Sequence, residues 1–435
     1  MSSGAKKTIE IFNENNGGFT IILATFLVLV VGLMIVLSMG YIGLNDIKIA
    51  RNNTYSAKAY YIAEGGIEDS LLRIRKGLNF FQNSSLTLGD GNATIEISDP
   101  IGGARTITAT GDKSSRFRKI RVVYTITTDS ISFYYGVQVG EGGMEMGNNS
   151  RVKGNVFSNG NIIAPNGKGY IDNSVVVAGS GNKIKGLEIG GDAFVHTCED
   201  SIISGDLTYV SGGSLINCTA GGTIKDQPNQ IDPVEMPISL ALVDKWKQEA
   251  AIGGIIPTDV TYNAISTSLG PIQIGTPTEP KNLIVTNNTQ LKITGTIYVT
   301  GNIIFDNNSI IELDRDAYGA FSGIIVADGR ITTQNNAVLR GTGEASSYIL
   351  ILSTNNSLSE ASPAISISNN ATGAIFYTTS GLVFLNNNMK AREVTAYKIK
   401  INNNAEIQYE SGLESAIFSS GPGGSWKVTE WREIE

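Results

Sequence analysis

A long uncharged segment near the N-terminus constrains this chain more than any other feature. Residues 19–45, from Phe19 to Asn45, contain no acidic or basic side chain. As an α-helix this segment would be about 40 Å long, which exceeds the roughly 30 Å hydrocarbon core of a bilayer. The apolar region of a secretory signal peptide is shorter, at about 7–15 residues, and no small-x-small cleavage site follows here. We therefore predict a membrane-spanning helix.

The apolar pattern continues beyond the uncharged segment at steps of three and four residues. The positions that carry it are Tyr55, Ala59, Ile62, Ala63, Ile67, Leu71 and Leu72. This spacing is typical of an amphipathic helix with one apolar face. We predict one helix over residues 19–76, with its transmembrane part at 19–45.

Residues 1–18 are polar and end in Gly17-Gly18, directly before the apolar run. A cut before Phe19 would leave the whole helix on the mature protein. This border resembles the class III leader peptide of type IV pilins. The resemblance implies that prepilin peptidase cuts between Gly18 and Phe19 and that Phe19 becomes N-methylated. A plain single-pass anchor is the alternative.

A second motif strengthens the resemblance. The segment Ala59–Ile67, with Ala63-Glu64-Gly65-Gly66 in its second half, is similar to a segment of PilX-type minor pilins and of the pseudopilins related to them. The resemblance covers about residues 10–130. The resemblance implies assembly with other pilin-like subunits through the helix, at Leu23 and Glu64. Leu23 departs from the pattern, because major pilins usually have Glu at that mature position.

The composition after residue 76 shifts toward Gly, Asn, Ser and Thr. Ala93–Ser98, Arg105–Thr110 and Ile120–Thr127 alternate apolar and polar residues, which is the period of half-buried strands. We predict a small antiparallel β region over 77–130, packed on the polar half of the helix.

From residue 131 the chain repeats short apolar strands that are separated by Gly or Asn. Ile184 and Ile203, in similar contexts, are 19 residues apart, and Asn pairs recur from Asn287, Asn307, Asn335, Asn355, Asn369, Asn386 and Asn402. Asn tolerates the left-handed backbone of a corner, and stacked Asn amides can hydrogen-bond between coils. This pattern predicts a β-solenoid; a β-sandwich is the alternative.

The solenoid is predicted in two parts, over 131–230 and 257–435. Between these parts, residues 231–256 are predicted to form a proline-rich linker and a surface helix around Ile238–Ala251. The C-terminal segment, with Trp426 and Trp431, is predicted to cap the last coil. The predicted fold class is thus mainly β: a long N-terminal α-helix that is transmembrane in its first half, a small antiparallel sheet, and a large parallel β-helix.

Few residues in the predicted solenoid have side chains that could be reactive or bind a metal. Cys198 and Cys218 lie 20 residues apart, about one coil, so either a disulfide or two buried thiols would fit. His196 is the one histidine and is expected to be structural. We expect no metal and no cofactor.

Three alternating acids offer the strongest enzymatic alternative. Glu312, Asp314 and Asp316 could share one strand face, and paired carboxylates can hydrolyse glycosidic bonds. We favour a solvated strand that is balanced by Arg315, and expect no enzyme. With 33 basic and 40 acidic residues the net charge is −7, which argues against nucleic-acid binding.

These observations predict a pilin-like protein that crosses the bacterial cytoplasmic membrane once and then reaches the cell surface or a pilus. It would be a minor component, possibly at the tip, whose solenoid head makes adhesive contact with a surface or a polysaccharide. The alternatives are a membrane-anchored carbohydrate-active β-helix enzyme and a structural polymer former that resembles bactofilins.

Overall fold

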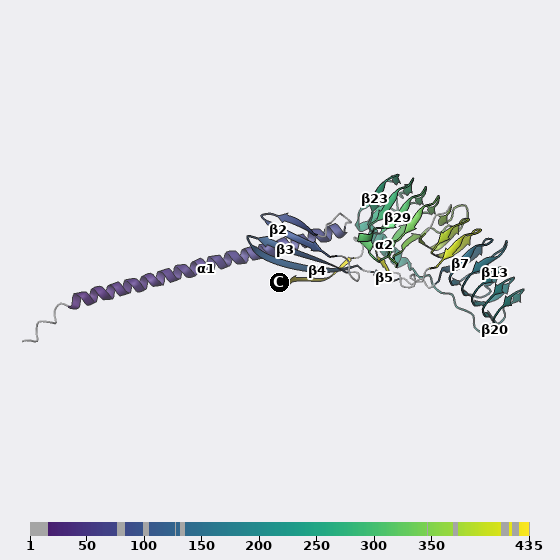
Figure 1. The fold of residues 1–435 in the computed structure, drawn as a ribbon, viewed down its shortest axis with the longest axis horizontal. Coiled ribbons are helices and arrows are strands. Elements are labelled where there is room, and N and C mark those ends of the chain that lie inside the picture. The colour runs from purple at the N-terminus through teal and green to yellow at the C-terminus, as the bar shows by residue number, and fades with distance from the viewer. Residues whose placement is uncertain are drawn as a thin grey trace, which may run out of the picture.

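The computed structural model describes residues 16–75, 83–98, 104–126, 128–130, 135–345, 347–368, 373–409, 417–419 and 426–434. It confirms the predicted fold class, because a long helix, a small antiparallel sheet and large parallel sheets follow one another in the molecule. In Figure 1 the helix projects from the small sheet on the side away from the solenoid.

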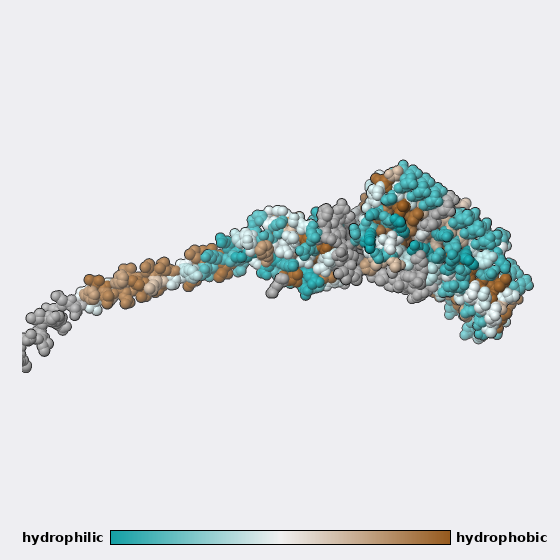
Figure 2. Space-filling view, viewed as in Figure 1, coloured by the Kyte–Doolittle hydropathy of each residue, from teal (hydrophilic) through white to brown (hydrophobic). Residues whose placement is uncertain are grey.

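The helix α1 runs over Asn16–Arg75 without a break, close to the predicted 19–76. Its first half contacts no other part of the described chain, and Phe19, Leu23 and Leu37 are all more than half exposed. Figure 2 shows this half as a continuous apolar surface that gives way to polar residues near the small sheet. The expected leader residues 1–15 lie outside the described residues.

The small sheet has five antiparallel strands in the order β1-β2-β3-β4-β40. Its strands are β1 (Asn83–Leu88), β2 (Gly91–Ile97), β3 (Ala104–Lys113), β4 (Arg116–Ile126) and β40 (Trp426–Ile434). Alternate residues of β2 are buried, as the period of two predicted, and they pack with the second half of α1. A second, two-stranded sheet pairs β5 (Thr128–Ser130) with β39 (Ile417–Ser419).

The prediction that the C-terminus caps the solenoid is wrong. The C-terminal strand β40 pairs antiparallel with β4, so that Trp431 lies beside Val122 and Trp426 beside Ile126. The reason is the unpaired edge of β4: this edge strand has free backbone donors and acceptors, and β40 supplies partners for them. The solenoid is therefore inserted between two neighbouring strands of the small sheet.

Each solenoid coil contributes strands to three faces, which we name A, B and C. Face A consists of β21 (Ile255–Ile256), β24 (Ile272–Ile274), β27 (Ile297–Val299), β30 (Gly323–Ala327), β33 (Ile349–Ser353), β8 (Val156–Ser158), β11 (Val175–Val177), β14 (Ala193–Val195), β17 (Leu207–Val210) and β20 (Ile224–Gln227). Three longer strands pass from face A to face B: β35 (Ile375–Leu385), β37 (Glu393–Ile401) and β6 (Val137–Met146).

The other two faces follow the same coils. Face B consists of β22 (Val260–Asn263), β25 (Leu283–Thr286), β28 (Ile303–Phe305), β31 (Ile331–Thr333), β34 (Ile365–Ile367), β9 (Ile162–Ile163), β12 (Lys183–Lys185), β15 (Thr197–Glu199) and β18 (Leu215–Ile216). Face C consists of β23 (Ser266–Leu269), β26 (Gln290–Ile293), β29 (Ile310–Leu313), β32 (Val338–Arg340), β36 (Lys390–Ala391), β38 (Glu406–Gln408), β7 (Arg151–Lys153), β10 (Gly169–Ile171), β13 (Leu187–Ile189), β16 (Ile202–Ile203) and β19 (Thr219–Ala220).

The coils do not stack in sequence order. The chain enters at β6, in the middle of the solenoid, and runs outward to β20. It then returns past α2 (Leu240–Ile252), starts again at β21 at the opposite end, and runs back until β37 pairs in parallel with β6. We call 137–227 the distal half and 255–408 the proximal half. Figure 1 shows β20 far from α1 and β23 toward the small sheet.

The coils form one continuous core, because every strand pairing between coils is parallel and keeps the inward positions in register. Ile184, Val285 and Ile351 are fully buried members of this core. The parallel stacking excludes the β-sandwich alternative, in which antiparallel sheets face one another.

Asparagine residues form corners of the proximal half, as predicted. Asn287, Asn307 and Asn335 all have positive φ, between 47° and 55°. Their side-chain amides form a ladder: Nδ2 of Asn287 donates to Oδ1 of Asn263 (2.9 Å), Asn307 to Asn287 (3.0 Å) and Asn335 to Asn307 (3.3 Å).

Three other predicted corners do not take the asparagine geometry expected of them. Asn355 does not adopt positive φ; its Oδ1 accepts from the backbone N–H of Ser357 (3.0 Å). In the later coils the left-handed residues are Asn388 and Asn404, two positions after Asn386 and Asn402. The predicted corner at residue 369 lies outside the described residues.

The helix α2 occupies the predicted position and packs on the outside of face A. Ser239 caps its N-terminus, since the hydroxyl oxygen accepts from the N–H of Leu242 (3.3 Å). The buried Trp246 and Val243 join outward residues of face A, among them Tyr377, in a second apolar cluster. The proximal half therefore has two apolar layers, one inside the coils and one between face A and α2. One four-residue helix, α3 (Arg315–Tyr318), follows β29.

Candidate functional site

Close approach between α1 and the small sheet depends on residues without large side chains. Ala59 and Ala63 are fully buried on the helix. A Cβ placed on Gly111 of β3 would lie 2.0 Å from the carbonyl oxygen of Ala59, and one on Gly66 would lie 3.1 Å from the Cβ of Ala93. The alanine-glutamate-glycine segment of the sequence thus forms part of the α1 surface that docks on the sheet, together with Ile67 and Leu71.

The predicted processing and assembly residues lie on α1 without protein contacts or at the edge of its docked part. Gly18 is in the helix, and apart from the adjoining helix itself no described heavy atom lies within 4 Å of the position of an added Cβ; the adjacent Phe19 is 70% exposed. Leu23 is 54% exposed. Glu64 is partly buried, between the buried Ala63 and the half-buried Gly65. These residues do not converge on one site; Leu23 and Glu64 are 41 positions, or about 60 Å, apart along the helix.

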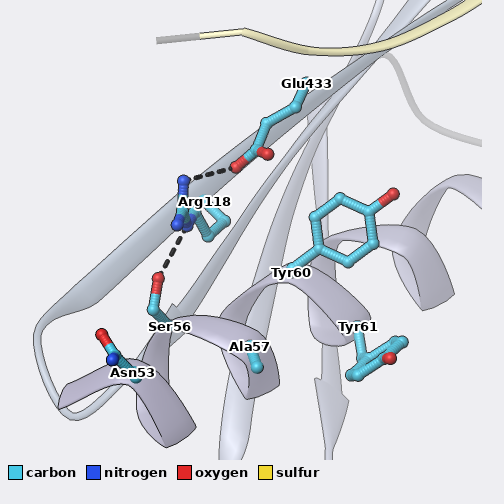
Figure 3. Close-up of a pocket in the computed structure, with 7 residues that line it drawn as sticks. All are labelled: Asn53, Ser56, Ala57, Tyr60, Tyr61, Arg118 and Glu433. Carbon is cyan, nitrogen blue, oxygen red and sulfur yellow. Dashed lines mark hydrogen bonds and ion pairs between the residues drawn. The ribbon is translucent and has the colours of Figure 1, made fainter. Parts of the chain in front are cut away.

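A groove joins the helix, the small sheet and the C-terminal strand. Its volume is about 370 Å³, and Asn53, Ser56, Ala57, Tyr60, Tyr61, Arg118 and Glu433 line it. In Figure 3 the Arg118 side chain lies between the helix and β40: Nε donates to Oγ of Ser56 (2.7 Å) and Nη1 to Oε1 of Glu433 (2.8 Å). Tyr61 is 68% exposed beside them.

This groove was missed at the sequence level. Arg118 and Glu433 are 315 residues apart, and only the pairing of β40 with β4 brings them together. Apolar and polar residues alternate over 426–429, which is a strand signal, but no sequence feature names the partner of that strand.

The three alternating acids do not share a face for paired catalysis. Glu312 accepts from Nε of Arg340 in the next coil (2.9 Å), and Asp314 caps α3 by accepting from the N–H of Ala317 (3.0 Å). Asp316 lies within α3, because the strand ends at Leu313, and the predicted alternation does not extend to it. Arg315, the expected charge partner, contacts Glu344 instead (2.7 Å).

The two cysteines form a disulfide in the last coils of the distal half. Cys198 lies on β15 and Cys218 in the corner after β18, with 6.2 Å between their Cα atoms. Nδ1 of the neighbouring His196 lies 3.0 Å from Oγ1 of Thr197. Among the residues the structure describes, no cluster of three His, Cys, Asp or Glu side chains could hold a metal ion.

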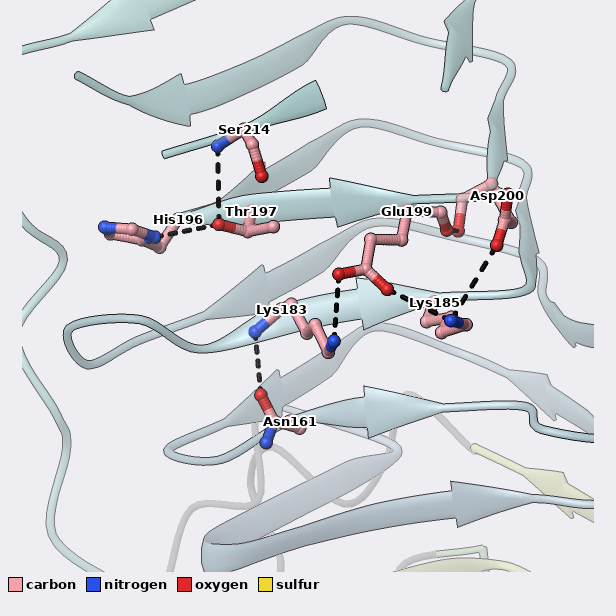
Figure 4. A network of polar contacts seen from close by, with 9 residues as sticks. Asn161, Lys183, Lys185, His196, Thr197, Glu199, Asp200 and Ser214 are labelled. Carbon is pink, nitrogen blue, oxygen red and sulfur yellow. Dashed lines mark hydrogen bonds and ion pairs between the residues drawn. The ribbon is translucent and has the colours of Figure 1, made fainter. Parts of the chain in front are cut away.

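Ion pairs join neighbouring coils on face B at Glu199, the residue after Cys198 (Figure 4). Lys183 and Lys185 both approach Glu199, at 2.9 and 3.2 Å. Hydrogen bonds from Lys183, and then from Lys185, lower the pKa of the Glu199 carboxyl. Oδ1 of Asn161 accepts from the backbone N–H of Lys183 (2.9 Å). Nζ of Lys185 also lies 3.9 Å from Asp200, so two carboxylates balance the two ammonium groups of this network.

One buried carboxyl lies where the two halves meet. Glu393, at the start of β37, is fully buried, and its side chain makes a short hydrogen bond with the Thr395 hydroxyl. Burial raises the pKa of Glu393 well above its ordinary range, because the charged form is poorly solvated there. The nearby Tyr377 hydroxyl bonds the backbone of Ile238, at 3.2 Å from its nitrogen and 3.1 Å from its oxygen, and so fixes the segment that leads into α2.

Comparison with known proteins gives distant structural likenesses alone. No family model and no curated protein matches the sequence. The competence-associated pilin ComZ from Thermus thermophilus aligns at 9% identity and a TM-score of 0.23, over 88% of this chain and 98% of that one. An ice-binding protein from an Antarctic Flavobacteriaceae bacterium aligns at 9% identity and a TM-score of 0.15, over 64% and 97%. TM-scores this low do not establish a shared fold.

Proposed function

We propose that this chain is a pilin-like surface protein: prepilin peptidase cuts it between Gly18 and Phe19, its new N-terminus is methylated, and α1 carries it through the bacterial cytoplasmic membrane into an assembly with other pilin-like subunits. The observation that carries the proposal is the division of α1. One half is apolar and is covered by none of the other residues that the structure describes, and the other half is docked on the small sheet through Ala59, Ala63 and Gly66.

The exposed half of α1 needs an apolar environment. Its most apolar window has a mean hydropathy of 3.0 and is 0% buried within the protein. A bilayer would cover this surface before assembly, and the helices of neighbouring subunits would cover it afterwards. Both environments remove the same apolar area from water, which makes the transfer between them energetically feasible.

The solenoid is proposed as the head that makes contact outside the cell. It comprises most of the chain after the small sheet, and in Figure 1 it lies at the end of the molecule opposite to the membrane helix. A head of this size on every subunit would crowd a tightly packed shaft, and Leu23 lacks the carboxylate that could pair with a neighbour's terminal amine. We therefore propose a minor component near the fibre tip, and a role in adhesion.

The two alternatives receive less support. An enzyme would need free, paired acids, whereas Glu312 is bound to Arg340 and Asp314 caps a helix. A polymer former would need open ends. At the distal end, Asp226 pairs in register with Tyr209, a residue packed against the core, so a carboxylate occupies an inward position of the terminal strand. Inward charges of this kind oppose edge-to-edge stacking.

The decisive experiment is to identify the N-terminus of the mature protein. Mass spectrometry of the membrane-extracted protein should give methylated Phe19, and Gly18→Leu should accumulate a precursor that starts at Met1. Gly32→Leu is the matched control, because both glycines lie on exposed helix with open space around them. An N-terminus at Met1 or near Gly43 in the wild type would contradict the proposal, as would equal processing of Gly18→Leu.

The position in the fibre has a separate test. Gold-labelled antibodies against the solenoid, viewed on sheared fibres by electron microscopy, should mark fibre ends. Uniform labelling along the shaft would make this chain the main subunit and would refute the minor role.

A further inference from the structure

Face B of the proximal half presents an outward row without charge over six successive coils. In-register pairing aligns its members as Thr261, Ile284, Ile304, Thr332, Ser366 and Phe384. The residues on either side of each along its strand point into the coil, as Leu283 and Val285 do around Ile284. We call these six residues the uncharged row. All six are partly or fully exposed.

The character of this row changes abruptly at the junction with the distal half. The next position in register is Lys400, followed by Glu145. Nζ of Lys400 lies 3.1 Å from Glu145 and 2.8 Å from Glu360, which comes from the loop after β33. Further along, the same row contains Lys185 and Glu199. The uncharged row therefore has a definite end, formed by an ion-pair cluster.

Polar groups in fixed orientations flank the uncharged row on both sides. Two residues upstream of the row, a side-chain Oδ1 of one coil accepts from a backbone N–H of the next coil. These pairs are Asp259 with Asn282 (2.7 Å), Asn282 with Asn302 (2.8 Å) and Asn302 with Arg330 (2.8 Å). Downstream lies the asparagine ladder of the corner between faces B and C. Because these side chains are held by the neighbouring coils, a ligand would not have to order them, which lowers the entropic cost of binding.

The dimensions of this surface select among partners. Coils stack about 4.8 Å apart and strands rise about 3.3 Å per residue, so six coils and five positions along the strand span about 24 by 13 Å, or roughly 300 Å². A stable protein–protein interface takes about 800 Å² from each partner. The surface is thus too small for a second copy of the chain, but its length suits a narrow polymer that lies along the solenoid axis.

We propose that the uncharged row binds a neutral, linear polysaccharide, with its chain parallel to the solenoid axis. Sugar rings carry apolar C–H faces that can pack on Ile284, Ile304 and Phe384, and their hydroxyls find donors and acceptors in the flanking amide rows. A neutral ligand requires no countercharge, and the central row offers none. This inference rests on the proposed function, because it assumes that the head is exposed outside the cell.

Calorimetric titration of the full chain in detergent micelles tests the proposal. The probes are two neutral hexasaccharides, cellohexaose and chitohexaose, and one acidic polymer, polygalacturonate. We expect at least one neutral hexasaccharide to bind with an affinity that does not change between low and high salt, since no charge pairs form on binding. Binding of neither, or binding of polygalacturonate alone with an affinity that falls with salt, would overturn the proposal.

Lysine substitutions at two positions of the same outward row, one in each half of the solenoid, provide a test and its matched control. Ile304→Lys places an ammonium in the uncharged row and should weaken binding at least about tenfold, because the ligand would have to desolvate that charge. Ile163→Lys makes the same change in the same row of the distal half, where charges already alternate, and should weaken binding less than about twofold.

A second variant guards against misfolding. Thr332→Glu replaces a side chain that is already polar with a charged one. It should reproduce the loss of binding, while the circular dichroism spectrum and the melting temperature stay those of the wild type. Equal losses in Ile163→Lys and Ile304→Lys, or full binding by Thr332→Glu, would overturn the assignment to this row. Failure here is distinguishable from failure of the proposed function, which shows as an uncut N-terminus whatever the purified chain binds.

Discussion

The proximal and distal halves of the solenoid have the same parallel core but are stabilised from outside in different ways. In the proximal half, α2 covers face A, and Trp246, Tyr298 and Tyr377 form a second apolar layer with no counterpart beyond β6. The distal half, all of whose residues 137–227 the structure describes, contains no helix. Both halves have ion pairs between coils, such as Lys183 with Glu199, and the distal half adds the disulfide of Cys198.

The difference shows how a solenoid compensates for a thin core. Each coil contributes only a few inward side chains, so a coil without an outer layer buries little apolar area, and the terminal coil has a neighbour on one side alone. A covalent link between the last coils restricts the conformations of the unfolded end and so stabilises its folded form. Three predictions test this contrast.

Removing the outer layer should have the largest effect. Trp246→Ala empties a fully buried site between α2 and face A and should lower the stability of the proximal half by about 3–5 kcal/mol. Hydrogen exchange followed by mass spectrometry should show faster exchange in β27, β30 and β33, and little change in β11 and β14. Leu240→Ala, at a 62% exposed position of the same helix, is the control and should cost under about 0.5 kcal/mol. Equal loss of protection in both halves would contradict the division.

Breaking the disulfide should have the next largest effect, at the opposite end. Cys218→Ser opens a loop with a sequence separation of 20 and should cost about 3 kcal/mol. Faster exchange should be confined to β17, β18, β19 and β20, and a reductant should reproduce it in the wild type while the proximal half stays protected. Loss of protection that spreads through the proximal half would show that the two halves unfold as one unit.

The smallest effect should come from the junction and should depend on pH. The pKa of buried Glu393 is raised, so the folded protein holds this proton to a higher pH than the unfolded chain, whose carboxyl titrates near 4.5. Its contribution to stability is therefore complete at low pH and is lost as pH rises through the raised pKa. Glu393→Gln should remove this dependence and make the protein about 1–2 kcal/mol more stable than the wild type at pH 8. Urea unfolding at pH 5 and pH 8 measures the free energy of unfolding of both proteins. An equal decline of this free energy with pH in the wild type and in Glu393→Gln would refute the prediction.

The sequence predicted local structure well, because local structure has a period. The apolar steps of three and four residues gave α1, the alternation of 93–98 gave β2, and Asn287 and Asn307 form the corners that their backbone tolerance indicated. The disulfide was one of two alternatives that the spacing of Cys198 and Cys218 left open.

What the sequence could not predict is which coil lies beside which. Every coil has the same pattern of inward aliphatic residues, so the pattern is compatible with any neighbouring coil. Nothing in the sequence of β37 or β6 indicates that these two strands pair. The same degeneracy hid the place of β40 and with it the contact of Arg118 with Glu433. The processing residues Gly18 and Phe19 stay predictions, since their role depends on an enzyme and not on a contact within the fold.

The insertion of the solenoid between β4 and β40 has a mechanical consequence. The chain leaves the small sheet after Ile126 and returns to it at Trp426, and these two residues are register partners. The two connections also pair with each other, through β5 and β39. A head held by a single strand could swivel about it, whereas two joined strands resist twisting and divide a pulling force between them. An object held by the solenoid would thus pull on a double tether, which transmits both tension and torque to α1.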